Sequence, residues 1–207
     1  MNSVTRAAAA AILVAIPGAA LAHPGHDAGG FAHGLVHPLG GLDHVLAMVA
    51  VGLYAALPGR RALWLVPATF VGVMAIGGAL GATGYPIPYA EIGIALSVMV
   101  LGLAVALRVS LPTLAAMALA GLFAIFHGHA HGTEMPADAT AVSYSAGFML
   151  ATALLHGAGI AIGLAAGKLA DRGGWRVAQA AGGAMALAGI ALLANACELR
   201  LILDRIA

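Results

Sequence analysis

The chain has 207 residues, of which 62% are hydrophobic and only 8% are charged, and its formal net charge is +1. This composition excludes an ordinary water-soluble domain, and the lack of any basic run excludes nucleic acid as a partner. The single cysteine, Cys197, excludes an intramolecular disulfide.

The first 22 residues have the pattern of a secretory signal peptide. Arg6 supplies a positive charge, residues 7–15 form a short apolar region, and Ala20-Leu21-Ala22 matches a cleavage site. Because that apolar region is shorter than the roughly 20 residues that span a bilayer, we expect residues 1–22 to be removed. An uncleaved anchor is the alternative. Residues 23–207 then form one membrane domain, which begins with His23 outside a bacterial inner (cytoplasmic) membrane.

The expected mature N-terminus reads His23-Pro24-Gly25-His26 and offers a possible site for metal capture. The free α-amine and the imidazole of His23 can chelate one ion together, and His26 can add a third nitrogen. Pro24 has no amide N–H, so binding through a deprotonated second amide is excluded. An ordinary polar tail is the alternative interpretation.

Six apolar segments follow, and each is long enough to cross a bilayer as a helix. They lie at residues 38–57, 62–81, 89–107, 112–130, 143–167 and 177–200, separated by Pro, Gly or charged residues. The sequence therefore predicts an all-α membrane protein, a compact bundle of six transmembrane helices.

Basic residues indicate how this bundle is oriented. With an outside N-terminus, the cytoplasmic loops hold six of them: Arg60, Arg61, Arg108, Lys168, Arg172 and Arg176. The outer loops between helices hold none, which satisfies the positive-inside rule. Both termini are then periplasmic. Arg200 and Arg205 in the tail are the exception, and that tail could instead lie along the membrane surface as a short amphipathic segment.

Small residues recur at four-residue spacing in two of the segments. Gly77-x3-Gly81 lies in the second, and Gly159-x3-Gly163-x3-Gly167 lies in the fifth. Such faces let helix backbones approach closely in lipid, where apolar burial gives no drive for association. We expect a tightly packed bundle rather than a wide pore.

Histidines and carboxylates are concentrated at the start of the first segment, where His33, His37, Asp43 and His44 lie. Pro38 suits the first position of a helix. His37 and His44 are seven residues apart, so on one continuous helix their imidazoles point the same way. Asp43 could bind an ion directly or accept the second N–H of a ligand imidazole. Histidines that cap a helix end are the alternative.

A second concentration lies at the end of the fourth segment. His127, His131 and Glu134 are spaced i, i+4, i+7 and share one stripe if the helix continues, while His129 faces away. Two histidines and a carboxylate can bind a divalent ion. A solvated histidine-rich loop is the alternative.

His156 lies near the middle of the fifth segment, and Glu91 lies at the start of the third. A single buried histidine is often hydrogen-bonded to the protein, and Glu91 could be a helix cap or a charge in a vestibule. Ionisable side chains at membrane depth cost roughly 2.5–3.5 kcal/mol each and commonly mark an ion pathway. Imidazole with a few carboxylates suits nickel, copper, zinc or iron.

Three motifs in this order resemble the HupE/UreJ family: His37-Pro38-x2-Gly41-x-Asp43-His44, then Phe126-His127-Gly128-x-Ala130-His131-Gly132-x-Glu134, then Leu155-His156-x2-Gly159. The resemblance implies a secondary nickel permease, with cobalt moved by some members, that supplies hydrogenase or urease maturation. It also implies that His37, Asp43, His44, His127, His131 and Glu134 are the essential residues. His129 falls at a variable position.

These observations predict a permease rather than an enzyme. No Gly-x4-Gly-Lys-Ser/Thr loop is present, so we expect facilitated diffusion of a divalent ion driven by the membrane potential. The ion would pass from the outer histidines to the first segment, and then to His156. The expected partners are the ion, the lipid bilayer and a possible second copy of the chain. The alternatives are a membrane metalloenzyme of the di-iron type and a metal-binding protein without transport.

Overall fold

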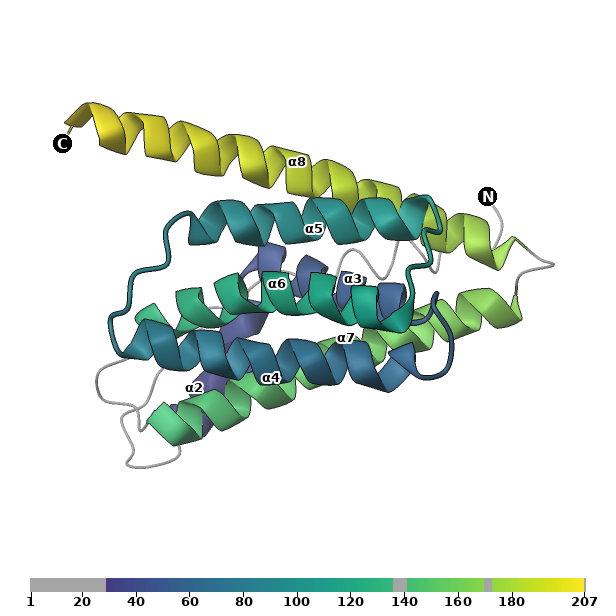
Figure 1. Ribbon diagram of the computed structural model, residues 1–207, viewed down its shortest axis with the longest axis horizontal. Helices are drawn as coiled ribbons and strands as arrows, with labels where there is room; N and C mark the ends of the chain where they lie inside the picture. The colour runs from purple at the N-terminus through teal and green to yellow at the C-terminus, as the bar shows by residue number, and fades with distance from the viewer. Residues whose placement is uncertain (1–28, 136–140, 170–172, 207) are drawn as a thin grey trace.

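The computed structural model describes residues 29–135, 141–169 and 173–206, and all regular secondary structure in these ranges is helical. In chain order the elements are α2 (Gly29–Val36), the 3-10 helix η1 (His37–Leu39), α3 (Leu42–Ala55), α4 (Ala62–Ala82), α5 (Ala90–Ala106), α6 (Thr113–Thr133), α7 (Ala141–Lys168) and α8 (Gly174–Ile206) (Figure 1). The all-α prediction is confirmed. The expected signal peptide lies outside the described residues, as do His23 and His26, so metal capture there stays a prediction.

Four helices are long and apolar enough to cross a membrane, namely α4, α6, α7 and the Gly174–Glu198 part of α8. The stretch from α2 through α3 makes a fifth candidate span, bent by 82° at its break. The sixth predicted segment corresponds to α5, which is apolar but has only 17 residues. All six predicted segments therefore coincide with helices, and four or five of these meet the requirements of a span.

The first predicted segment is not one continuous helix. The 3-10 helix η1 ends at Leu39, and α3 begins only at Leu42. Between them Gly41 has an extended backbone, with φ −101° and ψ 117°, which no helix accommodates. The expectation that His37 and His44 lie two turns apart on one helix is therefore wrong. The bend instead turns η1 across the N-terminal end of α3.

Helices pack most extensively in three pairs: α4 with α6, α5 with α8, and α3 with α7. Glycines make these contacts close. A Cβ atom at Gly128 would meet the carbonyl oxygen of Met74, and one at Gly159 would meet that of Val49. The predicted close packing through Gly77, Gly81 and Gly159 is confirmed, because backbone atoms of a partner helix face each of them.

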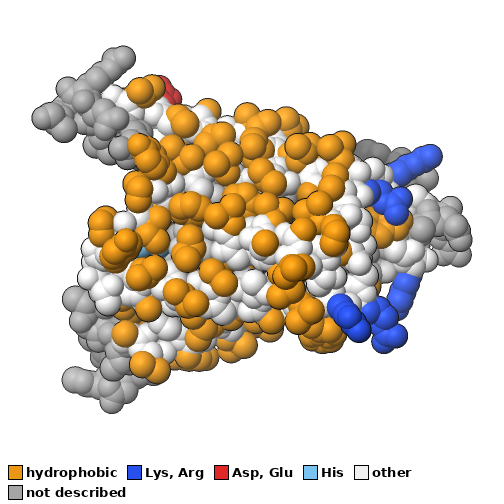
Figure 2. Space-filling model, viewed as in Figure 1, with side chains coloured by type: hydrophobic (Ala, Val, Ile, Leu, Met, Phe, Trp, Pro, Cys, Tyr) orange, Lys and Arg blue, Asp and Glu red, His pale blue; other side chains and the backbone are white. Residues whose placement is uncertain are grey.

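The two ends of the bundle differ in charge. Figure 2 shows Lys and Arg side chains gathered at one end of a face that is otherwise largely hydrophobic. Five of the seven described basic residues lie in or beside the connections α3–α4, α5–α6 and α7–α8: Arg60, Arg61, Arg108, Lys168 and Arg176. Asp43, Glu91 and Glu134 lie at the opposite helix ends, where α3 and α5 begin and α6 terminates. Apart from Arg200 and Arg205 near the end of α8, the described charges outside α8 therefore divide by sign between the ends.

The last helix is longer than a bilayer requires. α8 has 33 residues, which correspond to about 50 Å of helix against a hydrocarbon core of about 30 Å. Its C-terminal part projects past the N-terminal end of α5 (Figure 1). The tail thus continues the last helix as far as Ile206, and the alternative that it lies along the membrane surface stays a prediction.

We predict that Gly159→Ala destabilises the protein. The added methyl group would lie 2.9 Å from the Cα atom of Gly52, so α3 and α7 must separate. Overpacking of this kind costs about 1–3 kcal/mol. Thermal unfolding in detergent, followed by size-exclusion chromatography, measures the effect. Gly157→Ala is the matched control, because Gly157 is exposed on the same helix and has no atom within 4 Å of an added Cβ. Equal melting temperatures for the two variants would contradict the close contact.

Candidate metal site

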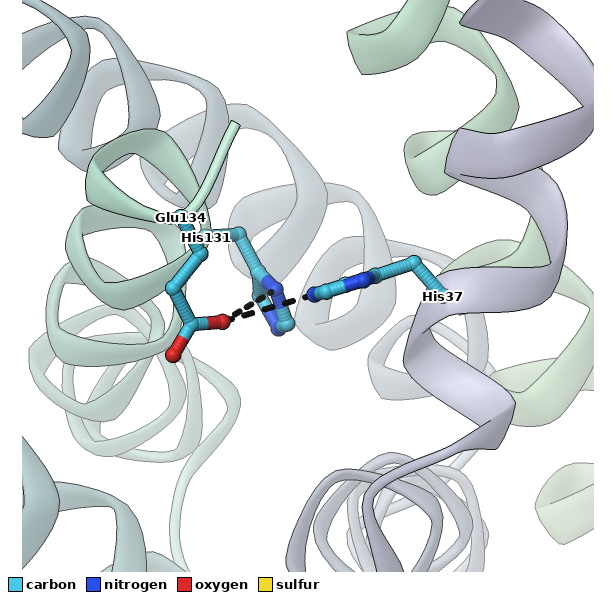
Figure 3. Close-up of side chains that lie close together, drawn as sticks. All are labelled: His37, His131 and Glu134. Atoms are coloured by element: carbon cyan, nitrogen blue, oxygen red, sulfur yellow. Dashed lines mark hydrogen bonds and ion pairs between the residues drawn. The ribbon is translucent and has the colours of Figure 1, made fainter. Parts of the chain in front are cut away.

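The first cluster of ligand-type side chains consists of His37, His131 and Glu134, called here the outer group. One nitrogen or oxygen from each lies within 4.8 Å of the others. Oε2 of Glu134 is 3.4 Å from Nε2 of His37 and 3.9 Å from Nδ1 of His131. Figure 3 shows the three side chains converging, His37 from η1 and the other two from the end of α6. The outer group is partly exposed, since the Glu134 side chain is 55% accessible.

A second cluster lies deeper and consists of His44, His127 and His131, called here the inner group. Nε2 of His44 is 2.9 Å from Nδ1 of His127 and is also in contact with Nε2 of His131. All three side chains are buried, with His127 wholly inaccessible. Three imidazole nitrogens therefore meet in an apolar interior, an arrangement that suits a borderline metal ion.

His131 belongs to both groups. Its Nδ1 faces Glu134, while its Nε2 faces His44. It also lines a cavity of about 300 Å³ together with His37, Asp43, His44, Glu91 and Glu134. Glu91 is thus a vestibule charge, in agreement with one of the two roles expected for it. The cavity is therefore lined by all three members of the outer group and by two members of the inner group, His44 and His131.

Asp43 lies beside His44 rather than within either group. Its Oδ1 accepts a hydrogen bond from the backbone N–H of His44 at 2.8 Å and is 4.0 Å from Nδ1 of the same residue. The carboxylate therefore lies nearest the ring nitrogen that points away from the inner group, but at 4.0 Å no hydrogen bond joins the two atoms. Both roles expected for Asp43, direct binding of an ion and orientation of His44, stay predictions.

His156 belongs to α7 and is buried inside the bundle next to Phe70. Its side chain is 1% exposed, and neither ring nitrogen has a hydrogen-bond partner among the residues that the structure describes. The expectation of an ordinary hydrogen-bonded histidine is therefore wrong at this position. The ring of Phe70 contacts both His156 and His127, at centroid distances of 5.1 and 5.6 Å. Phe70 thus separates the inner group from His156.

His129 faces away from both groups, as the helical spacing predicts. Its Nε2 is 2.8 Å from the carbonyl oxygen of Tyr85 and 3.3 Å from the backbone nitrogen of Ile87. A carbonyl can only accept, so the imidazole donates to Tyr85. His129 is only 7% exposed. The solvated-loop alternative is therefore wrong, because α6 continues to Thr133 and His129 holds the α4–α5 connection.

Sequence reasoning missed two residues of this region. Ser97 of α5 lies 2.8 Å from Nε2 of His127 and is fully buried. Phe70 of α4 packs on two histidine rings. One signal was available for Ser97, since it is the single hydroxyl residue of an otherwise apolar segment. Phe70 gave no signal, because a phenylalanine in an apolar helix is unremarkable.

The fold is that of a multi-pass membrane protein built from apolar helices. Imidazole and carboxylate groups line a cavity at one end of the bundle, and they form a candidate site for a metal ion. The chain belongs to the HupE/UreJ family, whose model, described as HupE / UreJ protein, matches residues 11–192. It is also 51% identical over 180 residues to the Protein HupE of Rhizobium leguminosarum bv. viciae, covering 87% of this chain and 93% of that protein. No solved structure is significantly similar.

We predict that His129→Ala loosens the α4–α5 connection. The variant removes the donor to the Tyr85 carbonyl, so amide hydrogen exchange should rise several-fold in the peptide that covers residues 83–89. Hydrogen-exchange mass spectrometry in detergent measures it. His33→Ala serves as the control, because His33 is exposed on α2 and its ring contacts are with His37 and Tyr144. Unchanged exchange in His129→Ala would refute the anchoring role.

Proposed function

We propose that this protein is a secondary permease that carries Ni²⁺, and Co²⁺ as a second substrate, across the bacterial inner membrane for hydrogenase or urease maturation. The observation that supports it best is the sharing of His131 between the outer and inner groups. Ligand-type atoms therefore follow one another from an open cavity into the core of the bundle. Membership in the HupE/UreJ family is consistent with this function.

The ligand type of the inner group is compatible with nickel. Its three members are imidazoles, which suit nickel, copper, zinc and iron alike. The choice of nickel among these ions rests on the family resemblance.

The proposed path begins in the cavity, where Asp43, Glu91 and Glu134 attract a cation. There the ion exchanges water ligands for the side chains of the outer group. It passes to the inner group when Nε2 of His131 replaces Nδ1 as the ligand, which requires the proton of this ring to move from Nε2 to Nδ1. It then passes Phe70 to reach the unpartnered nitrogens of His156. Several weak sites in series suit conduction, because the ion must leave each of them.

The distribution of charge supports an orientation. The basic end of the bundle would face the cytoplasm by the positive-inside rule, and the cavity would then open to the periplasm. The inside-negative potential drives a divalent ion inward, at about 2.3 kcal/mol per charge per 100 mV. We further propose that residues 23–207 form the permease domain with both termini periplasmic, and that a second copy of the chain is a possible partner.

Two other functions are distinguished by experiment. A metal-binding membrane protein without transport would bind Ni²⁺ but would not move it into sealed vesicles. A di-iron membrane enzyme would need many more clustered histidines, on the cytoplasmic side, than the four of the outer and inner groups, His37, His44, His127 and His131. Uptake by proteoliposomes that contain only this protein tests the permease directly.

We predict that Asp43→Asn lowers initial Ni²⁺ uptake 10–100-fold at limiting metal. The change keeps the side-chain volume but removes the charge beside Nδ1 of His44, and losses of such supporting groups have effects of this size. Glu198→Gln is the matched control, because it removes an exposed carboxylate of α8. Wild-type uptake in Asp43→Asn, with normal folding, would exclude this carboxylate from the mechanism.

We also predict that His131→Ala weakens the equilibrium binding of Ni²⁺ far more than His129→Ala does. The two residues lie on α6 and are equally buried, at 7% exposure each. Only His131 belongs to the outer and inner groups, so its loss should weaken binding at least 10-fold while His129→Ala stays within about threefold of wild type. Titration calorimetry in detergent makes the comparison. Equal losses would mean that the two groups do not bind the ion.

A further inference from the structure

The hydroxyl of Ser97 is the feature that the proposed path leaves unexplained. Ser97 lies within α5 and is fully buried. Its Oγ is 2.6 Å from the carbonyl oxygen of Ile94 and 2.8 Å from Nε2 of His127. Two polar contacts this short each require a proton between the two atoms.

The available protons settle the direction of both bonds. A hydroxyl has one proton, and a carbonyl oxygen can only accept. At 2.6 Å the Ser97 proton must lie toward Ile94, so Oγ donates there and accepts from the imidazole. His127 therefore has its proton on Nε2. Its Nδ1 has a lone pair, and this is the nitrogen that lies 2.9 Å from Nε2 of His44.

We propose that Ser97 is a positioning residue that holds His127 in the Nε2–H tautomer and so presents the Nδ1 lone pair to the inner group. A metal ion binds only the unprotonated nitrogen of an imidazole, and the partner of the other nitrogen decides which one that is. The tautomer follows from the hydrogen bonds alone, while its use in binding an ion rests on the proposed function.

No other described group replaces Ser97 in this role. Within the described part of the chain, Ser97 and His44 are the hydrogen-bonding partners of the His127 ring. Phe70 lies against the same ring but offers no conventional acceptor. Because His127 is wholly inaccessible, solvent cannot take the place of the hydroxyl. Without Ser97 the proton is free to move to Nδ1, where it would block the ligand position.

The tautomer can be observed directly by nitrogen NMR of the metal-free protein in detergent, with ¹⁵N in the histidine rings. Protonated and unprotonated ring nitrogens have well-separated shifts, and the His127 signals are assigned by their loss in His127→Gln. We expect a single Nε2–H form in the wild type and in Ser97→Thr, which keeps the hydroxyl. In Ser97→Ala we expect the Nδ1–H form to appear.

Binding of Ni²⁺ to the same variants tests the consequence. Ser97→Ala should lower the affinity 10–100-fold, and Ser97→Thr should restore most of it. Thr152→Val is the matched control, because it removes another fully buried hydroxyl, one whose partner is Met74 Sδ at 3.8 Å.

An Nδ1–H ring in wild-type His127 overturns the assignment, and this spectrum needs no variant that might fail to fold. An unchanged tautomer in Ser97→Ala overturns it as well, as does a loss of affinity in Thr152→Val equal to that in Ser97→Ala. If the tautomer behaves as expected but the wild type binds no Ni²⁺, the tautomer assignment stands and the proposed function fails.

Discussion

The structure is constrained above all by imidazole nitrogens buried where water cannot reach them. A neutral imidazole has one N–H and one lone pair, and each buried polar group without a partner costs about 1–3 kcal/mol. Ser97 and the Tyr85 carbonyl satisfy one nitrogen each on two of the rings. Among the described residues, neither nitrogen of His156 has a hydrogen-bond partner. In the inner group, nitrogens of three rings lie in contact. A cation there would be bound by their lone pairs in place of the shared protons. Since a whole domain is stable by only about 5–15 kcal/mol, these costs must be offset elsewhere.

Close packing of the helices offsets the cost of burying these imidazoles. In α6 the residues that pack closely and the candidate ligands lie within one stretch of six residues, 127–132. Gly128 and Gly132 lie one turn apart and face backbone atoms of α4. His127 and His131 precede them by one residue each and therefore line an adjacent face, where they meet His44. The glycines thus let α6 pack directly against α4, and the histidines beside them point toward His44 in the interior of the bundle. A larger residue at either glycine would move both histidines.

The sequence predicted the helices better than their interruptions. The apolar segments correspond to α3 through α8 because length and hydropathy decide spanning helices. The break at Gly40 and Gly41 was missed, since Pro38 suggested a helix start and the apolar segment that follows it was expected to be one continuous helix. The residues of the outer and inner groups were predicted, but their partition differs from the expected one, in which His127, His131 and Glu134 come first and His37, Asp43 and His44 follow. The structure instead places His37 with His131 and Glu134, and His127 with His44. This partition depends on which ring nitrogen of His131 faces which neighbour, and spacing along a helix contains no information on this. The family resemblance was confirmed by the match over residues 11–192.

The pairing of the helices has a consequence for motion. His44 belongs to α3, Ser97 to α5, and His127 and His131 to α6, so the connected set takes members from all three tightly packed pairs. Within a pair, backbones interlock through glycine and resist sliding. Displacement of one pair against the other two, as a rigid body, would leave the helices of each pair in contact. A shift of about 1 Å along such a boundary would separate nitrogens that now touch, while every helix kept its own shape. The imidazole cluster lies where the three pairs meet, so its geometry depends on the relative position of all three.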